Sequence, residues 1–456
     1  MRNLFKRVWN DERGNALMII GASLPLLVGA AGLATDTIQW TLWKRQLQRA
    51  ADSGAIAGVY TRIGTDTQDA VESAVTTDLE LNDHTGIELS TGFPEIERLA
   101  DDGDKKKQVK VSLEVSKALP FSSMFMDAAP PIRATATAAS VPGADEFCVL
   151  ATDESVAVVG LEVTGSTYLD LGNCSLMANS KHPSQAASNG NTGGGGGAGS
   201  GSTVKAKSLA AQGGVKYSNN WTVSDYDPNS PKITDPFGPD GQQPLPNPSS
   251  SDCSPGKTVT TDMTKNPAYP MDRTTGADAD TAGQTVCFSG GQGLKVQGAL
   301  KLQSGVTYII NGGDLVMNST SASITCDKCT IILTKFSDPA TTGNIKITGG
   351  TLSLTAPTDE GTYKGVALYQ DRRATDDGTT GQNQINGNNG ASITGAVYLA
   401  NRSLLYNGGS QTTAACMQIV SKRVSFSGNS NFKLTSECPL KGMTPIGGGQ
   451  RVRLVA

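Results

Sequence analysis

Eight cysteines are the residues of this chain with the most distinctive chemistry, and all of them lie after residue 147. An even number of cysteines confined to one part of a chain is typical of disulfides formed in an oxidising compartment. Pairing each cysteine with its neighbour in the sequence predicts four disulfides. These are Cys148–Cys174, Cys253–Cys287, Cys326–Cys329 and Cys416–Cys438.

The Cys326-Asp-Lys-Cys329 spacing also fits half of a zinc site or a redox-active thiol pair. A zinc site needs a second CxxC or a histidine pair, and the chain has only two histidines, His84 and His182. A redox pair needs a helix start that lowers the thiol pKa, and this setting lacks one. We therefore predict a local structural disulfide, with no metal and no cofactor.

One group of charged residues could act as a general acid and base. It consists of Asp371, Arg372, Arg373, Asp376 and Asp377. Clustered carboxylates beside an arginine occur in polysaccharide-cleaving enzymes, but a solvated loop with local ion pairs is the ordinary interpretation. No nucleophile, metalloprotease, phosphate-loop or dinucleotide motif stands in a usable context. We predict that the chain is not an enzyme and has no small-molecule substrate.

Composition excludes another class of function. The net charge is −4 and 18% of residues are charged, so there is no basic patch for nucleic acid. A length of 456 residues allows two or three domains.

An apolar stretch near the N-terminus is predicted to position the rest of the chain at a membrane. Ala16–Thr35 contains no charge, and twenty helical residues rise about 30 Å, which is enough to cross a bilayer. A cleaved signal peptide is the alternative, because Gly32-Leu33-Ala34 resembles a cleavage site. A second helical segment with Trp40 and Trp43 follows without a break, and it favours an uncleaved anchor.

The orientation follows from the cysteines. Basic residues on the two sides of the span differ only slightly in number. We therefore predict a single-pass protein with a cytoplasmic N-terminus and its bulk exported, because that part holds all the cysteines.

The helix beyond the span, Asp36–Gly58, is the candidate for contact with partners. Ile38, Leu42, Leu47 and Ala51 are predicted to lie on one stripe. Such a helix could pack on its own domain, or bundle with partner proteins through its small residues. The candidate contact residues are Trp40, Trp43, Leu47, Ala50, Ala51, Asp52 and Gly58.

The sequence predicts four regions, and its fold class is a membrane-anchored α+β N-terminal region followed by an all-β domain. The regions are a cytoplasmic tip (1–13), the anchor with its extended helix (14–60), a small α+β domain (61–141) and a β domain (142–456). In the α+β domain, Asp66 is predicted to cap a helix over Thr67–Leu81. Alternating residues 109–115 and residues 132–139 predict two strands.

The β domain repeats a short unit of two alternating apolar residues followed by glycine. Its examples are Leu161–Gly165, Leu294–Gly298, Ile345–Gly349 and Val424–Gly428. The repeat favours a parallel β-helix, and a β-sandwich is the alternative. Two interruptions are a Gly-rich loop (188–202) and a Pro-rich excursion (226–257), which either binds a partner or covers the side of the β domain.

The N-terminal stretch resembles the anchor of the Tad (tight adherence) or Flp pilus-assembly family, of the TadE/TadG type. The residues that carry the resemblance are Arg13-Gly-Asn-Ala16, Asp36 and Leu47-Gln-Arg-Ala-Ala-Asp-Ser-Gly-Ala-Ile-Ala-Gly58. Pilin-like members have Glu five residues after the processing glycine, whereas this chain has Ile19. Asp153-Glu-Ser-Val-Ala157 also lacks the second serine of the metal site that some TadG-like proteins carry.

The resemblance implies a retained, non-enzymatic component of a pilus-assembly or secretion machine in the bacterial inner membrane, with its β domain in the periplasm. Its expected partners are the membrane, other pilus-assembly proteins and further copies of itself. A surface adhesin or carbohydrate-active β-helix protein on a membrane anchor is the alternative.

Overall fold

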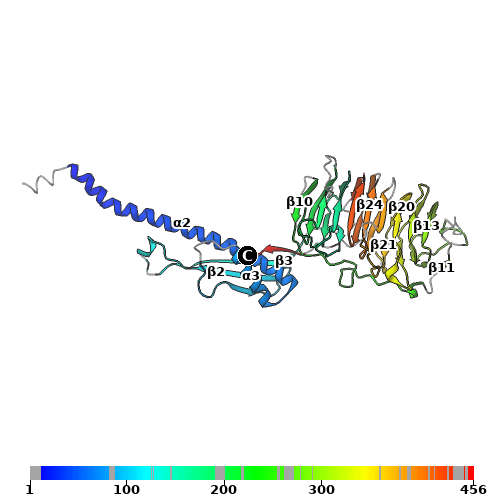
Figure 1. The fold of residues 1–456 in the computed structure, drawn as a ribbon, viewed down its shortest axis with the longest axis horizontal. Coiled ribbons are helices and arrows are strands. Elements are labelled where there is room, and N and C mark those ends of the chain that lie inside the picture. The colour runs from blue at the N-terminus through cyan, green and yellow to red at the C-terminus, as the bar shows by residue number, and fades with distance from the viewer. Residues whose placement is uncertain are drawn as a thin grey trace, which may run out of the picture. The chain divides into compact units, whose positions relative to one another are not determined.

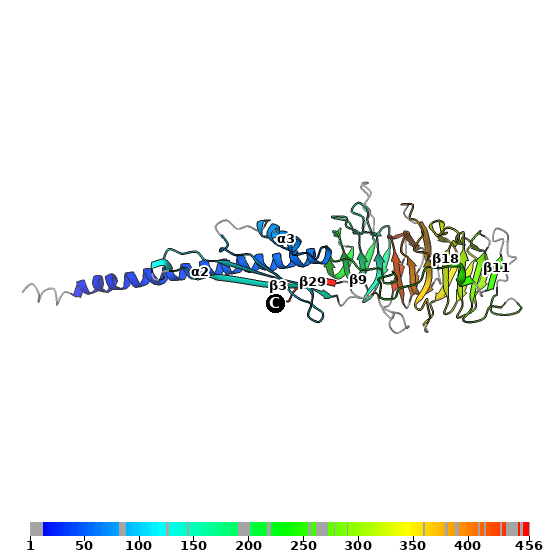
Figure 2. The same cartoon turned by 90° about the horizontal axis from the view of Figure 1, so that it is seen from below.

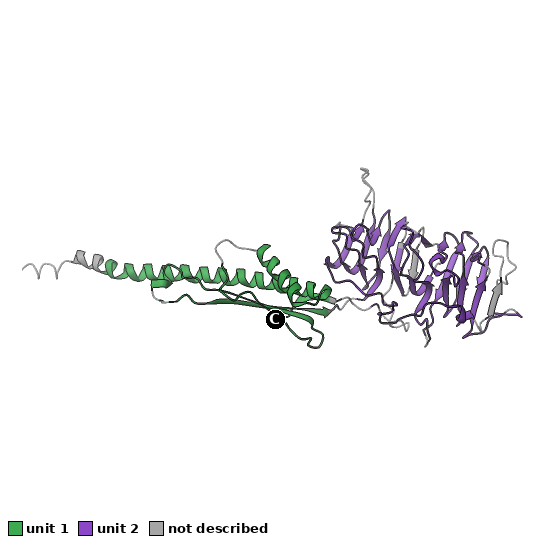
Figure 3. Ribbon diagram, turned by 60° about the horizontal axis from the view of Figure 1, so that its bottom comes forward, with its two compact units in different colours: residues 1–142, 451–456 green, residues 143–450 purple. Residues whose placement is uncertain are grey.

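The chain forms two compact units (Figure 3). Unit 1 comprises Met1–Pro142 and Arg451–Ala456, and unit 2 comprises Gly143–Gln450. The computed structural model describes residues 12–81, 88–124, 126, 128–143, 146–189, 201–216, 220–253, 257–260, 272–277, 279–289, 291–358, 361–378, 382–387, 392–408, 411–414, 416–428, 431–434, 446 and 450–455.

The described residues of unit 1 form two long helices. The first, α2 (Glu12–Gly64), joins the predicted span and its extension into one continuous helix that contains Pro25. The second, α3 (Gln68–Leu81), buries Val71 and Val75, at the four-residue spacing of one helix face. The predicted cap is not observed, because the carboxylate of Asp66 bonds to basic side chains instead.

A four-stranded sheet completes unit 1, in the order β1-β2-β3-β29. The strands are β1 (Glu95–Arg98), β2 (Lys106–Val115), β3 (Ile132–Pro142) and β29 (Gln450–Leu454), and a short helix, η1 (Ser122–Met124), follows β2. Alternate residues of β2 are buried, as the period of two predicts. The predicted boundaries of this domain, 61–141, therefore omit β29 and the part of α2 that packs on the sheet.

The described part of unit 2 contains short strands and the short helices η2 (Ser250–Cys253) and η3 (Pro339–Thr341). Its strands are β4 (Phe147–Ala151), β5 (Leu161–Val163), β6 (Tyr168–Asp170), β7 (Ser175–Ala178), β8 (Ala187–Asn189), β9 (Thr203–Ala211), β10 (Trp221–Asp227), β11 (Lys257–Thr260), β12 (Thr285–Ser289), β13 (Leu294–Val296), β14 (Ala299–Lys301), β15 (Thr307–Asn311), β16 (Leu315–Met317), β17 (Ser323–Cys326), β18 (Thr330–Thr334), β19 (Ile345–Ile347), β20 (Thr351–Thr355), β21 (Val366–Gln370), β22 (Asn383–Gly387), β23 (Ser392–Leu399), β24 (Leu404–Gly408), β25 (Gln411–Ala414), β26 (Met417–Ser421), β27 (Val424–Gly428) and β28 (Asn431–Leu434).

These strands pair in parallel and build three sheets, which differs from the antiparallel sheets of a β-sandwich. The first sheet has the order β11-β12-β15-β18-β21-β23-β26-β4-β7-β9-β10, and the second has the order β13-β16-β19-β22-β24-β27-β5-β8. The third consists of β14-β17-β20-β23 and β25-β28-β6-β9-β10. A turn of the chain such as β15-β16-β17 adds one strand to each of the three sheets.

The order of the turns differs from the order of the sequence. In all three sheets a late strand pairs with an early one: β26 with β4, β27 with β5, and β28 with β6. In Figure 1 the orange strands around β24 accordingly stand beside the teal strands that precede β10. The chain therefore enters the stack in its middle, winds to the β10 end, passes to the β11 end and winds back.

Candidate functional site

The first half of α2 presents apolar side chains outward. Its exposed residues include Ile19, Ile20, Leu24, Leu26, Leu27, Val28 and Leu33. Within the described residues, one helix is long and apolar enough to cross a membrane, and it covers Ile19–Gly64. Exposed leucines and isoleucines along an uncharged helix are typical of a surface that faces lipid.

A loop of unit 1 packs on this helix where the apolar run ends. The loop connects β2 to β3, and Figure 2 shows it in cyan beside α2. The ring of Phe121 lies so close to Gly32 that a Cβ added there would stand 2.2 Å from it. One helical turn later, the buried Asp36 accepts a hydrogen bond of 2.6 Å from the backbone N–H of Ser122. Gly32 and Asp36 thus hold the loop against the helix.

The second half of α2 packs into the core of unit 1. Leu47, Ala51, Ala55 and Val59 are buried against α3, β2 and β3. The predicted stripe is wrong, because Ile38 and Leu42 are exposed while Leu47 and Ala51 are buried. At 100° per residue, the nine positions from Ile38 to Leu47 turn the helix to its opposite side.

The candidate contact residues divide into two groups. Trp43, Leu47, Ala51 and Gly58 are buried inside unit 1, so in this structure they are core residues rather than a surface for partners. Gly58 lies where α2 meets α3 and β2, since an added Cβ would stand 2.8 Å from Val109 Cγ1 and 3.2 Å from Val75 Cγ2.

The second group is only half-buried and comprises Trp40, Ala50 and Asp52. Asp52 accepts a hydrogen bond of 2.8 Å from Gln48 Nε2, one turn earlier on the same helix. The exposed Arg45 and Arg49 lie on the same part of α2. The surface of this part of α2 that a partner could contact therefore includes polar and basic side chains as well as the small side chain of Ala50.

Asp66, just after α2, gathers three basic side chains. Its carboxylate accepts hydrogen bonds from Lys107, Arg98 and Arg62, the last at 3.0 Å. The hydrogen bond from Lys107, aided by those of the two arginines, lowers the pKa of Asp66 well below its usual range. This network ties the end of α2 to β1 and β2.

Three disulfides lie in the described part of unit 2, and they join the predicted pairs. They are Cys148–Cys174, Cys253–Cys287 and Cys326–Cys329. Cys416 is also disulfide-bonded, but Cys438 lies outside the described residues, so that pairing stays a prediction. The half-zinc-site alternative is not observed, because both sulfurs of the CxxC are bonded to each other.

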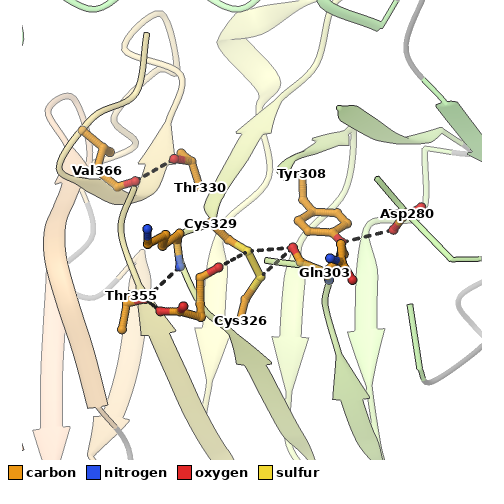
Figure 4. The surroundings of a disulfide bond; sticks show 10 residues. Asp280, Gln303, Tyr308, Cys326, Cys329, Thr330, Thr355 and Val366 are labelled. Atoms are coloured by element: carbon orange, nitrogen blue, oxygen red, sulfur yellow. Dashed lines mark hydrogen bonds between the residues drawn. A yellow bond between two sulfur atoms is a disulfide. The ribbon is translucent and has the colours of Figure 1, made fainter. Parts of the chain in front are cut away.

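Figure 4 shows the surroundings of the Cys326–Cys329 disulfide. It closes the turn between β17 and β18, where Lys328 has a positive φ and donates its backbone N–H to Thr355 Oγ1 at 2.8 Å. The carbonyl oxygen of Gln303 lies 3.2 Å from Cys329 Sγ. No helix begins at either cysteine, as the sequence indicates.

The Pro-rich excursion covers the outside of the first sheet. We call residues 228–253 the strap, because they connect β10 at one end of the stack with β11 at the other. Ile233, Phe237 and Leu245 of the strap are buried, in a cluster with residues from nine strands of the sheet. Asn179 fixes the strap by exchanging two hydrogen bonds with the backbone of Ile233.

The candidate catalytic cluster holds the strap. Arg372 donates hydrogen bonds to the carbonyl oxygens of Phe237 at 2.7 Å and Leu245 at 2.8 Å. Arg373 donates to the carbonyl of Pro248 at 2.6 Å and pairs with the buried Asp371. The basic members of the cluster thus bind the backbone of their own chain.

Asp371 and Asp376, two acidic members of the cluster, have different partners. Asp371 accepts a hydrogen bond of 2.7 Å from Thr334, whereas Asp376 pairs with Lys422 at 2.9 Å and Arg423 at 3.0 Å. Each of the two carboxylates thus binds partners within its own fold.

A cleft of about 480 Å³ lies beside the last part of the strap. Pro246 and Asp252 of the strap, Lys328, Tyr363 and Lys364 contribute to its walls. Burial, reinforced by the charge of Asp252, raises the pKa of Tyr363 far above its usual value, so this tyrosine is a neutral hydrogen-bonding group. Within the described residues, no group of three histidine, cysteine or acidic side chains could hold a metal ion.

These features of the described residues define a class of protein with a candidate membrane helix, a small α+β unit built on that helix, and a large stack of parallel strands. Residues 14–61 match the model of the Tad family, described as Flp pilus-assembly TadE/G-like. The chain thus carries a TadE/G-like segment that covers nearly all of α2. No curated protein and no solved structure matches the chain.

Proposed function

We propose that this chain is a non-enzymatic, inner-membrane-anchored component of a Tad/Flp-type pilus-assembly or secretion machine that acts through protein–protein contacts. One observation carries the proposal: the TadE/G-like match at residues 14–61 coincides with α2. That helix combines an exposed apolar half with a half that forms the core of unit 1. A retained anchor with a folded unit built on it suits a scaffold.

The disulfides support an exported unit 2, with the N-terminus in the cytoplasm and the bulk of the chain in the periplasm. Cys148–Cys174, Cys253–Cys287 and Cys326–Cys329 all lie in unit 2. Disulfides form and persist in the bacterial periplasm and are rare in the cytosol.

A parallel β-helix is the architecture that we propose for unit 2. Turns such as β15-β16-β17 and β18-β19-β20 contribute one strand to each of three parallel sheets, and buried residues of equivalent strands stack along the unit. For example, Leu294 of β13 lies beside Leu315 of β16, which lies beside Ile345 of β19. Such a stack offers long, regular side surfaces for protein contact.

The contacts that the charged cluster makes inside unit 2 support a non-enzymatic role for the chain. Arg372 and Arg373 bind carbonyl groups of the strap, and Asp371 is paired with Arg373. A general acid or base must reach a bound substrate, whereas these groups are occupied in holding the strap.

Photo-crosslinking in cells that assemble the pilus tests the proposal. A photoreactive residue replaces Arg49, exposed on α2, in one strain, and Asp102, exposed in the turn between β1 and β2, in another. We expect the Arg49 position to yield an adduct with another pilus-assembly protein, or with a second copy, at several times the yield of Asp102. Unchanged surface pili in a strain that lacks the gene would overturn the proposal.

A further inference from the structure

The loop between β2 and β3 has an unusual sequence for an exposed connection. Its residues Ala118–Met126 read Ala-Leu-Pro-Phe-Ser-Ser-Met-Phe-Met and contain no charge. Connections between strands in water are normally polar. The backbone N–H of Met126 bonds to the carbonyl of Ser122 at 2.9 Å and that of Met124 bonds to the carbonyl of Phe121 at 3.2 Å, so the loop forms a compact helical turn.

Several apolar side chains of this turn are exposed. Met124 is 75% exposed and Met126 is 44% exposed, while Phe121 is half-buried against Gly32. Single exposed apolar residues are ordinary on a protein surface. These residues, however, belong to the turn whose Phe121 packs on Gly32, the residue next to the exposed Leu33 of α2.

The contacts fix the depth of the loop. Gly32 lies inside the uncharged run Ala16–Thr35, about 5 Å from its end at 1.5 Å per residue. A side chain that packs on Gly32 therefore lies about 5 Å inside the end of the run. Apolar segments that bind a membrane surface enter about 5–10 Å, which is comparable to the distance of Phe121 from the end of the run.

We propose that the described residues of this loop, Ala118–Met124 and Met126, insert into the leaflet of the bilayer that faces unit 1 and bind lipid acyl chains through Phe121, Met124 and Met126. The inference rests on the membrane anchoring included in the proposed function. The hydrogen bond from Ser122 to Asp36 and the fit of Phe121 on Gly32 couple the loop to the helix. With a second point of insertion, unit 1 is fixed against rotation about the axis of α2.

Lipid photo-crosslinking from three positions tests the inference. The full-length protein is reconstituted into vesicles of phosphatidylethanolamine and phosphatidylglycerol, and carries a diazirine residue at Met124, at Leu26 in the apolar half of α2, or at Asp102. Asp102 lies in the turn before β2, at the other end of that strand from the loop. Mass spectrometry measures the fraction of chains joined to lipid.

We expect the lipid yield at Met124 to be within about threefold of that at Leu26, and at least tenfold above that at Asp102. A yield at Met124 equal to that at Asp102, with strong labelling at Leu26, overturns the inference and leaves the anchor intact. Absence of lipid labelling at Leu26 overturns the membrane anchoring itself. Adducts from Met124 to a second protein chain, instead of lipid, also overturn the inference.

Loosening the loop gives an independent measurement. Asp36→Ala removes the acceptor for the Ser122 N–H without touching the exposed side chains. We expect lipid labelling at Met124 to fall several-fold in this variant while labelling at Leu26 is unchanged. Equal labelling at Met124 in both proteins contradicts the coupling that the inference requires.

Discussion

Leu150 of β4 lies directly beside Val420 of β26, although 270 positions separate them in the sequence (420 − 150). The stack of unit 2 therefore has a seam at which its first turn in the sequence meets its last. The strap connects the two outer ends of this stack, so its attachment holds together two halves that the chain builds separately.

Removal of the Arg372 side chain should release the strap. Arg372→Ala deletes both hydrogen bonds to the carbonyls of Phe237 and Leu245, and we expect a loss of about 3 kcal/mol in the free energy of unfolding of unit 2, since bonds to charged groups contribute about 1.5–3 kcal/mol each. Limited proteolysis of the full-length protein should show faster cleavage within residues 228–253.

Lys346→Ala is the matched control for Arg372→Ala. Lys346 forms an exposed ion pair with Asp314 at 2.7 Å, and such pairs contribute about 1 kcal/mol or less. Equal cleavage of the strap in the Arg372→Ala and Lys346→Ala proteins contradicts the role assigned to Arg372.

Two disulfides of unit 2 should differ in their effect on stability. Cys253–Cys287 joins residues 34 apart, whereas Cys326–Cys329 joins residues 3 apart. Loop-closure entropy predicts losses of about 4 and about 1.6 kcal/mol when each pair is replaced by alanine. Guanidinium unfolding of the two double variants measures the difference, and a larger loss for Cys326→Ala/Cys329→Ala contradicts it.

Acid should weaken unit 1 through Asp66. Its pKa is lowered in the folded state by Lys107, Arg62 and Arg98, so its contribution is present above the ordinary carboxyl pKa, near 3.8, and is lost as the pH falls through the folded-state pKa. Asp66→Asn should lower the thermal midpoint at pH 7 and reduce its further fall in acid.

Two comparisons make the Asp66 measurement specific. Asp104→Asn, at an exposed carboxylate shortly before β2, should leave the pH dependence unchanged. Added salt should weaken the effect of Asp66, which is about one-third exposed. An acid-induced fall that is identical in Asp66→Asn and the parent protein contradicts the prediction.

The packing of α2 on its own unit depends on Gly58. In Gly58→Ala the new Cβ stands 2.8 Å from Val109 Cγ1, and overpacking of this kind costs about 1–3 kcal/mol. Gly64→Ala, in the same helix with no atom within 4 Å of the new Cβ, is the control. Thermal unfolding of unit 1 should distinguish the two variants, and equal midpoints contradict this packing.

Short-range patterns predicted more of this protein than long-range relationships. The four apolar-x-apolar-x-Gly units became β5, β13, β19 and β27, all strands of the same sheet. The alternation of apolar residues predicts which side chains face inward, and the glycine predicts the turn that follows. This pattern cannot predict which turns of the chain are neighbours in the stack, because the edges of all turns present the same backbone groups.

Side-chain partners far apart in the sequence were also beyond prediction. Arg372 and Phe237 lie in separate parts of the chain and meet only because the strap crosses the sheet. The charged cluster therefore has residue types that occur in active sites, but its two arginines bind the backbone of the strap. Similarly, Asp66 was a good helix cap by position, but its carboxylate bonds to the nearby Arg62 and to Arg98 and Lys107, which come from strands later in the chain.

The position of β29 has a consequence for biogenesis. This strand, Gln450–Leu454, is the outer neighbour of β3, and the N–H of Val455 bonds to the carbonyl of Thr137 at 2.8 Å. A ribosome makes β3 some three hundred residues before β29, so the edge of β3 stays open throughout the synthesis of unit 2. An open edge invites wrong pairing, and a chain truncated before residue 450 would keep that edge permanently.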